Sequence, residues 1–508
     1  MTQQAKQLLI AYIFLLSIVQ NSRAATATSH TFFFVPPTYS VPMIRSFYRH
    51  AKGIVRWGAW EAVPYYSHST NACKLTQFFM PFSKTKLTVS EYKPSVPSST
   101  TDLNPLKDVE ARHFNIETDP NFPAAFSSII TFAPEHTVIG TGFTIQQTLY
   151  KNFKEEPRLW LEVSFPVEQV RHKMNFKEEI INDGGGAVNE LGLDNAPRVG
   201  SMTAAFQQPN WNYGKIDNKT RTAQGVADVT VSLNWGTFFP RAYSSTGIGF
   251  TAPTGTEINA QNAAYVFAPV IGNNHHWEII FWNQLEINLL DRNDHSLKLY
   301  CNGRGSIIIR NHQVRSFDLD DKSWGRYMET YASQAAAQDA QTTMNPNSGT
   351  SGINVFTLCL QIDPRYQAET KTALTYQYKG LLAEFGGGLY VRHAELFERN
   401  TLRQRIALKD VNGNGNTNLA RTIGKNFPGT AITAINDYTD AIVYLNDMNF
   451  LTATHPSIIT TTVYGTIGHQ WMNCKAPTLL ALGSSYDFSS RNTSLNRWAI
   501  WGKCAVSF

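Results

Sequence analysis

The sequence predicts an all-β fold: a transmembrane antiparallel up-and-down β-barrel of about 12 to 14 strands, with long loops and a few short helices. Three observations predict it. The chain begins with an export signal, it contains many long runs in which apolar and polar residues alternate, and its last residue closes such a run. An exported chain with strands of this length hides its backbone polar groups in a bilayer only if its sheet closes on itself.

Composition excludes several other classes. Of the 508 residues, 16% are charged and 12% are aromatic, which does not fit a disordered chain or a coiled coil. The 44 Lys and Arg residues exceed the 39 Asp and Glu residues by only five, and no basic run is present. We therefore expect no nucleic-acid partner.

The first residues predict a signal peptide. Lys6 precedes an apolar run from Leu8 to Val19, and small residues before Ala24 and Ala27 offer cleavage sites at 24 or 27. The run is shorter than the roughly 20 residues of a membrane-spanning helix. We assign 1–24 to the signal peptide, 28–70 to an N-terminal plug or periplasmic segment, and 71–508 to the barrel.

Period-two alternation is the dominant local pattern in the exported part. In the run 227–239, Val229, Val231 and Leu233 alternate with Thr230 and Ser232. The runs 277–289 and 297–304, joined by the polar link 291–296, predict a hairpin. Further strands are expected at 141–150, 159–167, 246–252, 354–362, 371–397, 458–471, 479–488 and 498–508, with weaker ones at 78–92 and 125–132. Helices are expected only in the connections 41–52, 167–181 and 327–342.

Soluble sandwiches also alternate, so length and aromatic placement decide for the membrane. The runs match the roughly 9 to 11 residues of a tilted membrane strand. Trp and Tyr lie near many predicted strand ends, which suits the headgroup region. These aromatic residues are Trp160, Trp235, Trp277, Tyr464, Trp471 and Tyr486.

The final strand carries a family resemblance. Trp498, Val506 and Phe508 lie on one alternating run that ends at the carboxyl terminus. Together with the signal peptide, this run resembles the bacterial outer-membrane β-barrel proteins, whose last strand is read by the barrel-assembly machinery. Val506 stands where that signal usually has an aromatic residue, and Gly502 is one position earlier than the usual glycine.

The resemblance is to porin-like or fatty-acid-transporter-like members of an uncharacterised subfamily, to which 31–40 and 225–235 also look similar. It implies the outer membrane as location, with outer-membrane lipid and the assembly machinery as partners. The N-terminal segment, with Pro36 and Pro37, is similar to the hatch of fatty-acid transporters, although it also fits a periplasmic flap.

The alternation predicts which charged side chains face the lumen. Five acids and four bases fall on the polar face, which predicts no strong ion selectivity. An alternative is that these charges pair across neighbouring strands. The predicted lumen-lining residues are Glu162, Asp228, Glu278, Glu286, Lys298, Arg304, Glu384, Arg392 and Lys503.

Motifs of known enzymes and metal sites are missing from the sequence, so we expect no enzyme and no cofactor. His275 and His276 are adjacent and are expected at the membrane interface. Cys474 and Cys504 are a candidate disulfide, or all five cysteines are free. The run Gly386 to Gly388 predicts a bulge, a bend or a close approach of inserted protein.

The function expected is a porin-like channel or passive transporter for small polar or amphipathic solutes. Two alternatives stay open: a structural or adhesive barrel with a plugged lumen, and a barrel-embedded lipid hydrolase with a Ser/His pair near the membrane edge.

Overall fold

The structure is a computed structural model that describes residues 29–36, 57–91, 108–119, 121–151, 157–190, 192, 196–292, 294–320, 323–331, 349–398, 406–408, 442–443, 448–471, 476–489 and 491–508. The predicted signal peptide, the expected helix at 41–52 and Cys474 lie outside these residues.

A closed ring of twelve antiparallel strands forms the barrel, and it confirms the predicted fold class. Each strand pairs with its neighbours along the chain, and the last strand pairs with the first. The strands are β1 Gly58–Ser69, β5 Glu135–Lys151, β6 Pro157–Lys173, β9 Val229–Phe238, β10 Ala242–Ala252, β11 Glu278–Arg292, β12 His295–Ile308, β18 Tyr366–Tyr378, β19 Leu381–Arg392, β24 Ile458–Trp471, β25 Thr478–Phe488 and β26 Arg497–Ser507.

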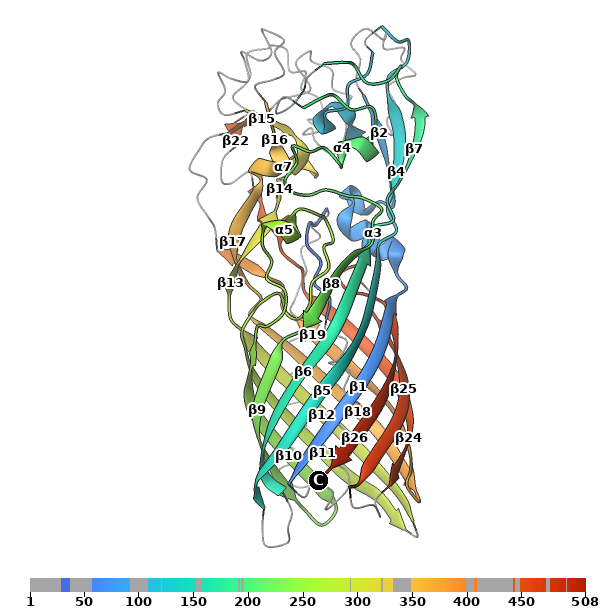
Figure 1. The fold of residues 1–508 in the computed structure, drawn as a ribbon, viewed down its shortest axis with the longest axis vertical. Helices are drawn as coiled ribbons and strands as arrows, with labels where there is room; N and C mark the ends of the chain where they lie inside the picture. The colour runs from blue at the N-terminus through green and yellow to red at the C-terminus, as the bar shows by residue number, and fades with distance from the viewer. Residues whose placement is uncertain are drawn as a thin grey trace.

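The two ends of the barrel differ. At one end the strands are joined by short turns, as where Tyr378 pairs with Leu381 across the turn between β18 and β19. The carboxyl terminus lies at this end (Figure 1). Five long connections join the strands at the other end: 70–134, 174–228, 253–277, 309–365 and 393–457. We call the described parts of these connections the cap.

The described part of the cap contains small sheets and short helices. One sheet has the order β3-β2-β4-β7, and the others are β13-β17-β20, β16-β15-β21-β22 and β14-β23. Their strands are β2 Lys86–Ser90, β3 Val109–Glu110, β4 Ser127–Thr131, β7 Lys177–Asn182, β13 Asn311–Ser316, β14 Asp318–Leu319, β15 Glu329–Tyr331, β16 Thr350–Ser351, β17 Thr357–Asp363, β20 Leu396–Glu398, β21 Ile406–Leu408, β22 Ile442–Val443 and β23 Met448–Asn449. The α-helices are α3 Ala72–Phe79, α4 Met202–Ala205, α5 Ala260–Ala263 and α7 Gly352–Val355, the 3₁₀ turns are Pro81–Ser83, Ala111–Phe114, Gly325–Tyr327 and Phe450–Ala453, and β8 Arg221–Val226 extends the sheet beside β6.

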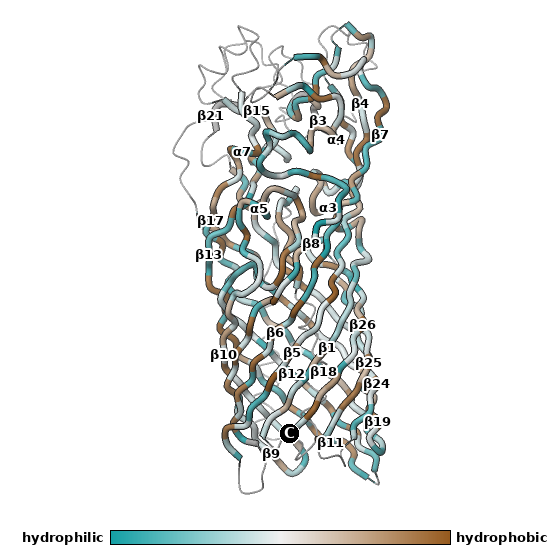
Figure 2. Tube along the Cα trace, in the orientation of Figure 1, coloured by the Kyte–Doolittle hydropathy of each residue, from teal (hydrophilic) through white to brown (hydrophobic). Residues whose placement is uncertain are grey.

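The barrel strands turn apolar side chains outward and polar side chains inward. On β11, Ile279 and Phe281 are 40% and 47% exposed, whereas Glu278 and Gln284 are 3% and 1% exposed. Figure 2 shows brown apolar positions alternating with pale and teal ones along the barrel strands. An exposed apolar exterior around a polar interior is the arrangement of a barrel in lipid, because a water-soluble barrel would be inverted.

Five predicted elements differ from the structure. The run 371–397 is a hairpin, β18 and β19, because Lys379 and Gly380 adopt positive φ and reverse the chain. The run 354–362 and the two weaker runs contribute to the cap and not to the barrel. The helix expected at 167–181 is wrong, because this segment continues β6 and forms β7.

The barrel also begins earlier than residue 71, because β1 Gly58–Ser69 is one of its strands. Within the described residues, no helix has the length and apolar character needed to cross a membrane.

Candidate functional site

The inner wall of the barrel is the first candidate site. Eight of the nine predicted lumen residues lie on the inward side of barrel strands: six are at most 5% exposed, and the Lys298 and Arg304 side chains are 13% and 16% exposed. The ninth, Asp228, is also buried, but it lies just before β9 in the cap connection 174–228, where it accepts the Gly255 backbone N–H at 3.2 Å. Six further charged residues face inward, and we did not predict them. They are Glu61, Glu168, Glu369, Lys371, Asp487 and Arg497.

Parity within the predicted strands would have identified Asp487 and Lys371, since inward residues recur at every second position. Glu369, Glu168 and Arg497 lie one or two residues outside the predicted runs. Glu61 was missed because β1 was missed.

Many inward charges pair across neighbouring strands, as the alternative interpretation of the sequence proposed. Arg497 Nε lies 2.7 Å from Asp487 Oδ2, and these residues are direct partners in the β25–β26 register. Lys298 pairs with Glu286 at 2.8 Å and Lys503 with Glu61 at 3.2 Å. Arg304 pairs with Glu278 at 3.8 Å, whereas Lys371 pairs with Glu369 of its own strand, β18. These pairs satisfy charges that burial would otherwise make costly.

Inward glycines make room for aromatic rings on adjacent strands. A Cβ at Gly386 would lie 2.6 Å from the Tyr464 ring, and one at Gly483 would lie 2.5 Å from the Trp501 ring. The pairing of β19 with both neighbours runs through Gly386 to Gly388 without a register shift. The predicted bulge or bend is therefore wrong, and the glycine at 386 accommodates a neighbouring ring.

Parity also corrects the aromatic prediction. Trp235, Trp277, Trp471 and Tyr486 are exposed outward as expected. Trp160 and Tyr464 are 5% and 3% exposed and face inward. They belong to the lumen wall and not to the membrane interface.

A short N-terminal strap, residues 29–36, occupies the region where barrel and cap meet, and it is the second candidate site. The backbone N–H of His30 donates to the Phe78 carbonyl at 3.1 Å, and that of Thr31 donates to the Thr452 carbonyl at 3.0 Å. At the other end of the strap, Arg497 Nη1 donates to the Pro36 carbonyl at 2.8 Å. The strap thus connects the cap with the inner wall of the barrel.

Two arginines cover aromatic rings of the strap. The guanidinium carbon of Arg392 lies 3.5 Å from the Phe34 ring centre, and that of Arg315 lies 3.1 Å from the Phe32 ring centre. Both geometries are cation–π contacts, which are strongest where water is excluded. Phe33 points the other way and packs on Phe78 with ring centres 4.9 Å apart.

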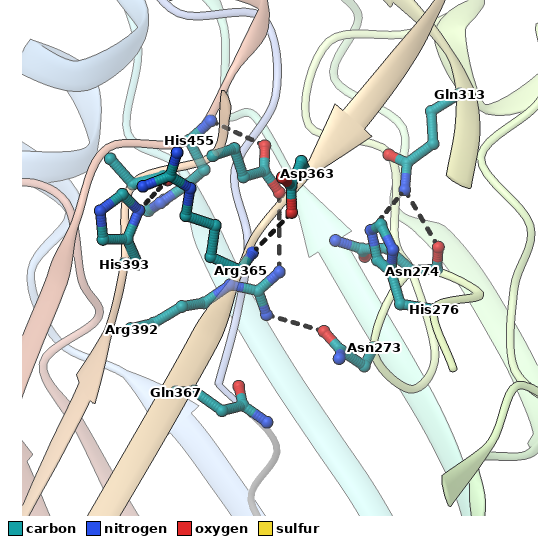
Figure 3. Close-up of polar contacts among 12 residues, drawn as sticks. Asn273, Asn274, His276, Gln313, Asp363, Arg365, Gln367, Arg392, His393 and His455 are labelled. Carbon is teal, nitrogen blue, oxygen red and sulfur yellow. Dashed lines mark hydrogen bonds and ion pairs between the residues drawn. The ribbon is translucent and has the colours of Figure 1, made fainter. Parts of the chain in front are cut away.

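One buried carboxylate lies between the two arginines. Glu395 is 3.8 Å from Arg315 Nη2 and 3.7 Å from Arg392 Nη2, and its side chain is 0% exposed. It also accepts the His455 backbone N–H at 2.8 Å, while Arg392 donates to Asn273 Oδ1 at 2.7 Å (Figure 3). Burial lowers the pKa of Arg315 to about 10, although Glu395 opposes this shift.

Buried histidines surround this cluster in the cap. His276 is 0% exposed; its Nδ1 donates to the Ile309 carbonyl at 2.8 Å, and its Nε2 accepts from Gln313 Nε2 at 2.9 Å. Burial lowers the pKa of His276 to about 3 and holds that of His455 well below its usual range. The prediction that His276 is interfacial is therefore wrong, because it lies in a connection inside the cap and not on a strand.

The hydrolase alternative receives no support from the histidine contacts. His68, His295 and His276 bond to Thr137, Tyr376 and Gln313. His136 bonds to His172, and His455 bonds to the Pro456 carbonyl. In the part of the chain that the structure describes, no group of three or more His, Cys, Asp and Glu residues is arranged to hold a metal ion. The expectation of no enzyme stays a prediction. Cys73, Cys301 and Cys504 are free thiols.

The predicted assembly signal lies on the last barrel strand. Trp498 and Val506 face outward on β26, and Phe508 is 57% exposed at the short-turn end. The Phe508 carbonyl accepts the backbone N–H groups of Trp57 and Gly58 at 2.9 Å and 3.0 Å. Whether an assembly machinery reads these residues stays a prediction.

No family model and no curated protein sequence matches the chain. Among solved structures, it is similar to an outer-membrane channel from Pseudomonas putida F1, with 12% identity and a TM-score of 0.37, covering 89% of this chain and 96% of that one. It is also similar to the toluene transporter TbuX of Ralstonia pickettii, with 8% identity, a TM-score of 0.27 and 90% of each chain covered. A FadL homologue from Pseudomonas aeruginosa gives 7% identity, a TM-score of 0.26 and 89% of each chain.

TM-scores at this level do not transfer a function. The closed ring of strands by itself confirms the resemblance to outer-membrane β-barrels at the level of fold.

Proposed function

We propose that the protein is an outer-membrane channel or passive transporter for small polar or amphipathic solutes, and that the cap closes its outer end in this structure. The observation that carries this proposal is the charged inner wall inside an apolar exterior. Acids and bases line the wall from Glu61 and Lys503 to Glu278 and Arg497.

The chemistry of the wall favours passage over a purely structural role. Buried ion pairs are weak evidence for stability, because apolar residues of similar volume often stabilise a core as well or better. A barrel that served only as an anchor would need no such lining. We expect these charged side chains to pair with one another while the path is closed and to become hydrated when a solute enters.

The orientation follows from the ends of the barrel. Outer-membrane barrels have short turns on the periplasmic side and long loops outside. We therefore place the cap outside the cell and the carboxyl terminus at the periplasmic face, with lipid around the apolar exterior.

Acids outnumber bases among the inward residues named above, which points to a mild cation preference once the path is open. This differs from the absence of selectivity that the balance of five to four suggested, because four of the six newly placed residues are acids.

Conductance of the refolded protein in a planar bilayer tests the proposal. We expect brief steps from a mostly closed level, with a reversal potential in a salt gradient that favours the cation. Glu162→Gln removes an inward acid and should shift that potential toward the anion, whereas Glu398→Gln, on the exposed outer side of the cap, should leave it unchanged. A barrel that stays electrically silent at all voltages, in every variant, would support the adhesive or structural alternative.

A further inference from the structure

We propose that the N-terminal strap, residues 29–36, is an autoinhibitory latch that holds the cap shut over the outer mouth of the barrel, and that Glu395 sets how firmly it is held. The inference rests on the proposed channel function and deepens it, because it names the element that keeps the path closed.

The strap contacts four of the five long connections as well as the barrel. His30 stacks on Phe78 with ring centres 4.4 Å apart, and the Thr31 hydroxyl donates to the Ser316 carbonyl at 2.6 Å. Phe33 contacts Phe267, and Thr452 accepts from the Thr31 backbone. These connections also share a core and small sheets of their own. The strap adds contacts that tie all four of them to the barrel wall, and its release would remove these ties.

The strap is held mainly by side chains. Residues 32–36 are in no strand, so no ladder of backbone hydrogen bonds ties them to a neighbouring strand. Phe32 and Phe34 lie under arginines, and Pro36 is held by Arg497 through one hydrogen bond. Segments with few backbone hydrogen bonds open locally without global unfolding.

Phe34 couples the latch to the barrel wall. It is 1% exposed and packs with Tyr390 and Ile458, which belong to β19 and β24. Arg392, which covers its ring, is the last residue of β19. Phe34 is therefore the point where the latch seals the inner edge of the barrel.

Glu395 neutralises two guanidiniums at once. Without its charge, Arg315 and Arg392 would be two buried cations near each other, and neither could keep its place over a phenylalanine without cost. Glu395→Gln preserves shape and removes only the charge, so it should loosen the latch without removing an atom that packs.

Hydrogen–deuterium exchange of the full exported chain in detergent micelles tests the latch directly. The amides of His30 and Thr31 are hydrogen-bonded across the strap and should be protected in the wild type. Phe34→Leu and Glu395→Gln should each accelerate their exchange by about tenfold. Phe34→Leu loses a desolvated cation–π contact, and Glu395→Gln leaves two buried guanidiniums without their counter-charge. Arg310→Gln, which breaks an exposed ion pair with Glu398, is the matched control and should leave exchange unchanged.

Comparison with the amides of the cap core gives the result that would refute the latch. If the strap is only part of that core, its amides will exchange together with those around Trp324 and Phe356 in every variant, and the latch is refuted. Unchanged exchange in Phe34→Leu would refute it too.

Conductance separates the two proposals. Phe34→Leu should raise the open fraction. Faster exchange of the strap amides in a variant that shows no conductance would refute the channel function. The strap would then be only a structural link between the cap and the barrel. Conductance at wild-type level with faster exchange would refute autoinhibition.

Discussion

Glycines placed opposite inward aromatic side chains shape the inner wall residue by residue. Gly483 and Trp501 are partners in the β25–β26 register, and Gly247 and Trp282 are partners between β10 and β11. Each ring lies against the backbone of the next strand and does not project across the lumen. Large residues therefore line the wall of the barrel without extending into its centre.

Gly483→Ala should destabilise the barrel by about 1–3 kcal/mol, because the new methyl group would overlap the Trp501 ring. Gly142→Ala is the control, since a Cβ there meets no atom within 4 Å. Urea unfolding of the refolded protein in lipid vesicles measures both. Equal stability of the two variants would contradict the packing described.

Acid should weaken the cap through its buried histidines. The pKa of His276 falls from 6.5 to about 3 on folding. Between these two pH values, His276 binds a proton in the unfolded chain but not in the folded chain. The contribution of His276 to the free energy of unfolding is therefore constant above about pH 6.5 and decreases as the pH falls from there toward 3. His455 shifts in the same direction.

Thermal unfolding of the cap, followed by near-ultraviolet circular dichroism between pH 7 and 4.5, measures this loss. His276→Gln should flatten the decrease. If that variant keeps the full slope, His276 is not responsible.

Strands and hairpins were the elements that the sequence predicted well. Lipid outside and polar groups inside impose period two on every strand, so β9, β11 and β24 were found within a few residues. β1 was missed because its two faces are mixed: Pro64 and His68 face out, while Val63 and Tyr65 face in.

The β1–β26 register also omits Val63 and Pro64, as expected where proline offers no N–H.

The β1–β26 seam closes the barrel, and Phe508 terminates it. Deleting Phe508 removes three backbone hydrogen bonds, with Trp57 and Gly58, at about 1 kcal/mol each. Phe508→Ala keeps these bonds and should be milder. The temperature at which the folded band disappears from a detergent gel should fall more for the deletion; the reverse order would argue against the seam.

The arrangement of the whole molecule was only partly predictable. Long connections were evident from the sequence, but their assembly into a cap depends on contacts between distant residues, such as Ser29 with Asp318 and Phe33 with Phe267. In the Arg315–Glu395–Arg392 cluster, only Arg392 and Glu395 are close in sequence. Arg315 and the strap rings that the two arginines cover come from distant parts of the chain, so no local pattern predicts the cluster. The eight predicted lumen residues that lie on barrel strands needed only strand parity, which is a local property.

Closure of the sheet is the claim on which channel, latch and orientation all depend. Heat-dependent mobility in a detergent gel tests it most directly, since a closed barrel stays folded and compact in detergent until it is boiled. We predict that the unheated protein migrates as a faster band than the boiled protein, and that the fast band disappears on heating. Identical mobility before and after boiling, with protein recovered from the outer membrane, would contradict a closed barrel.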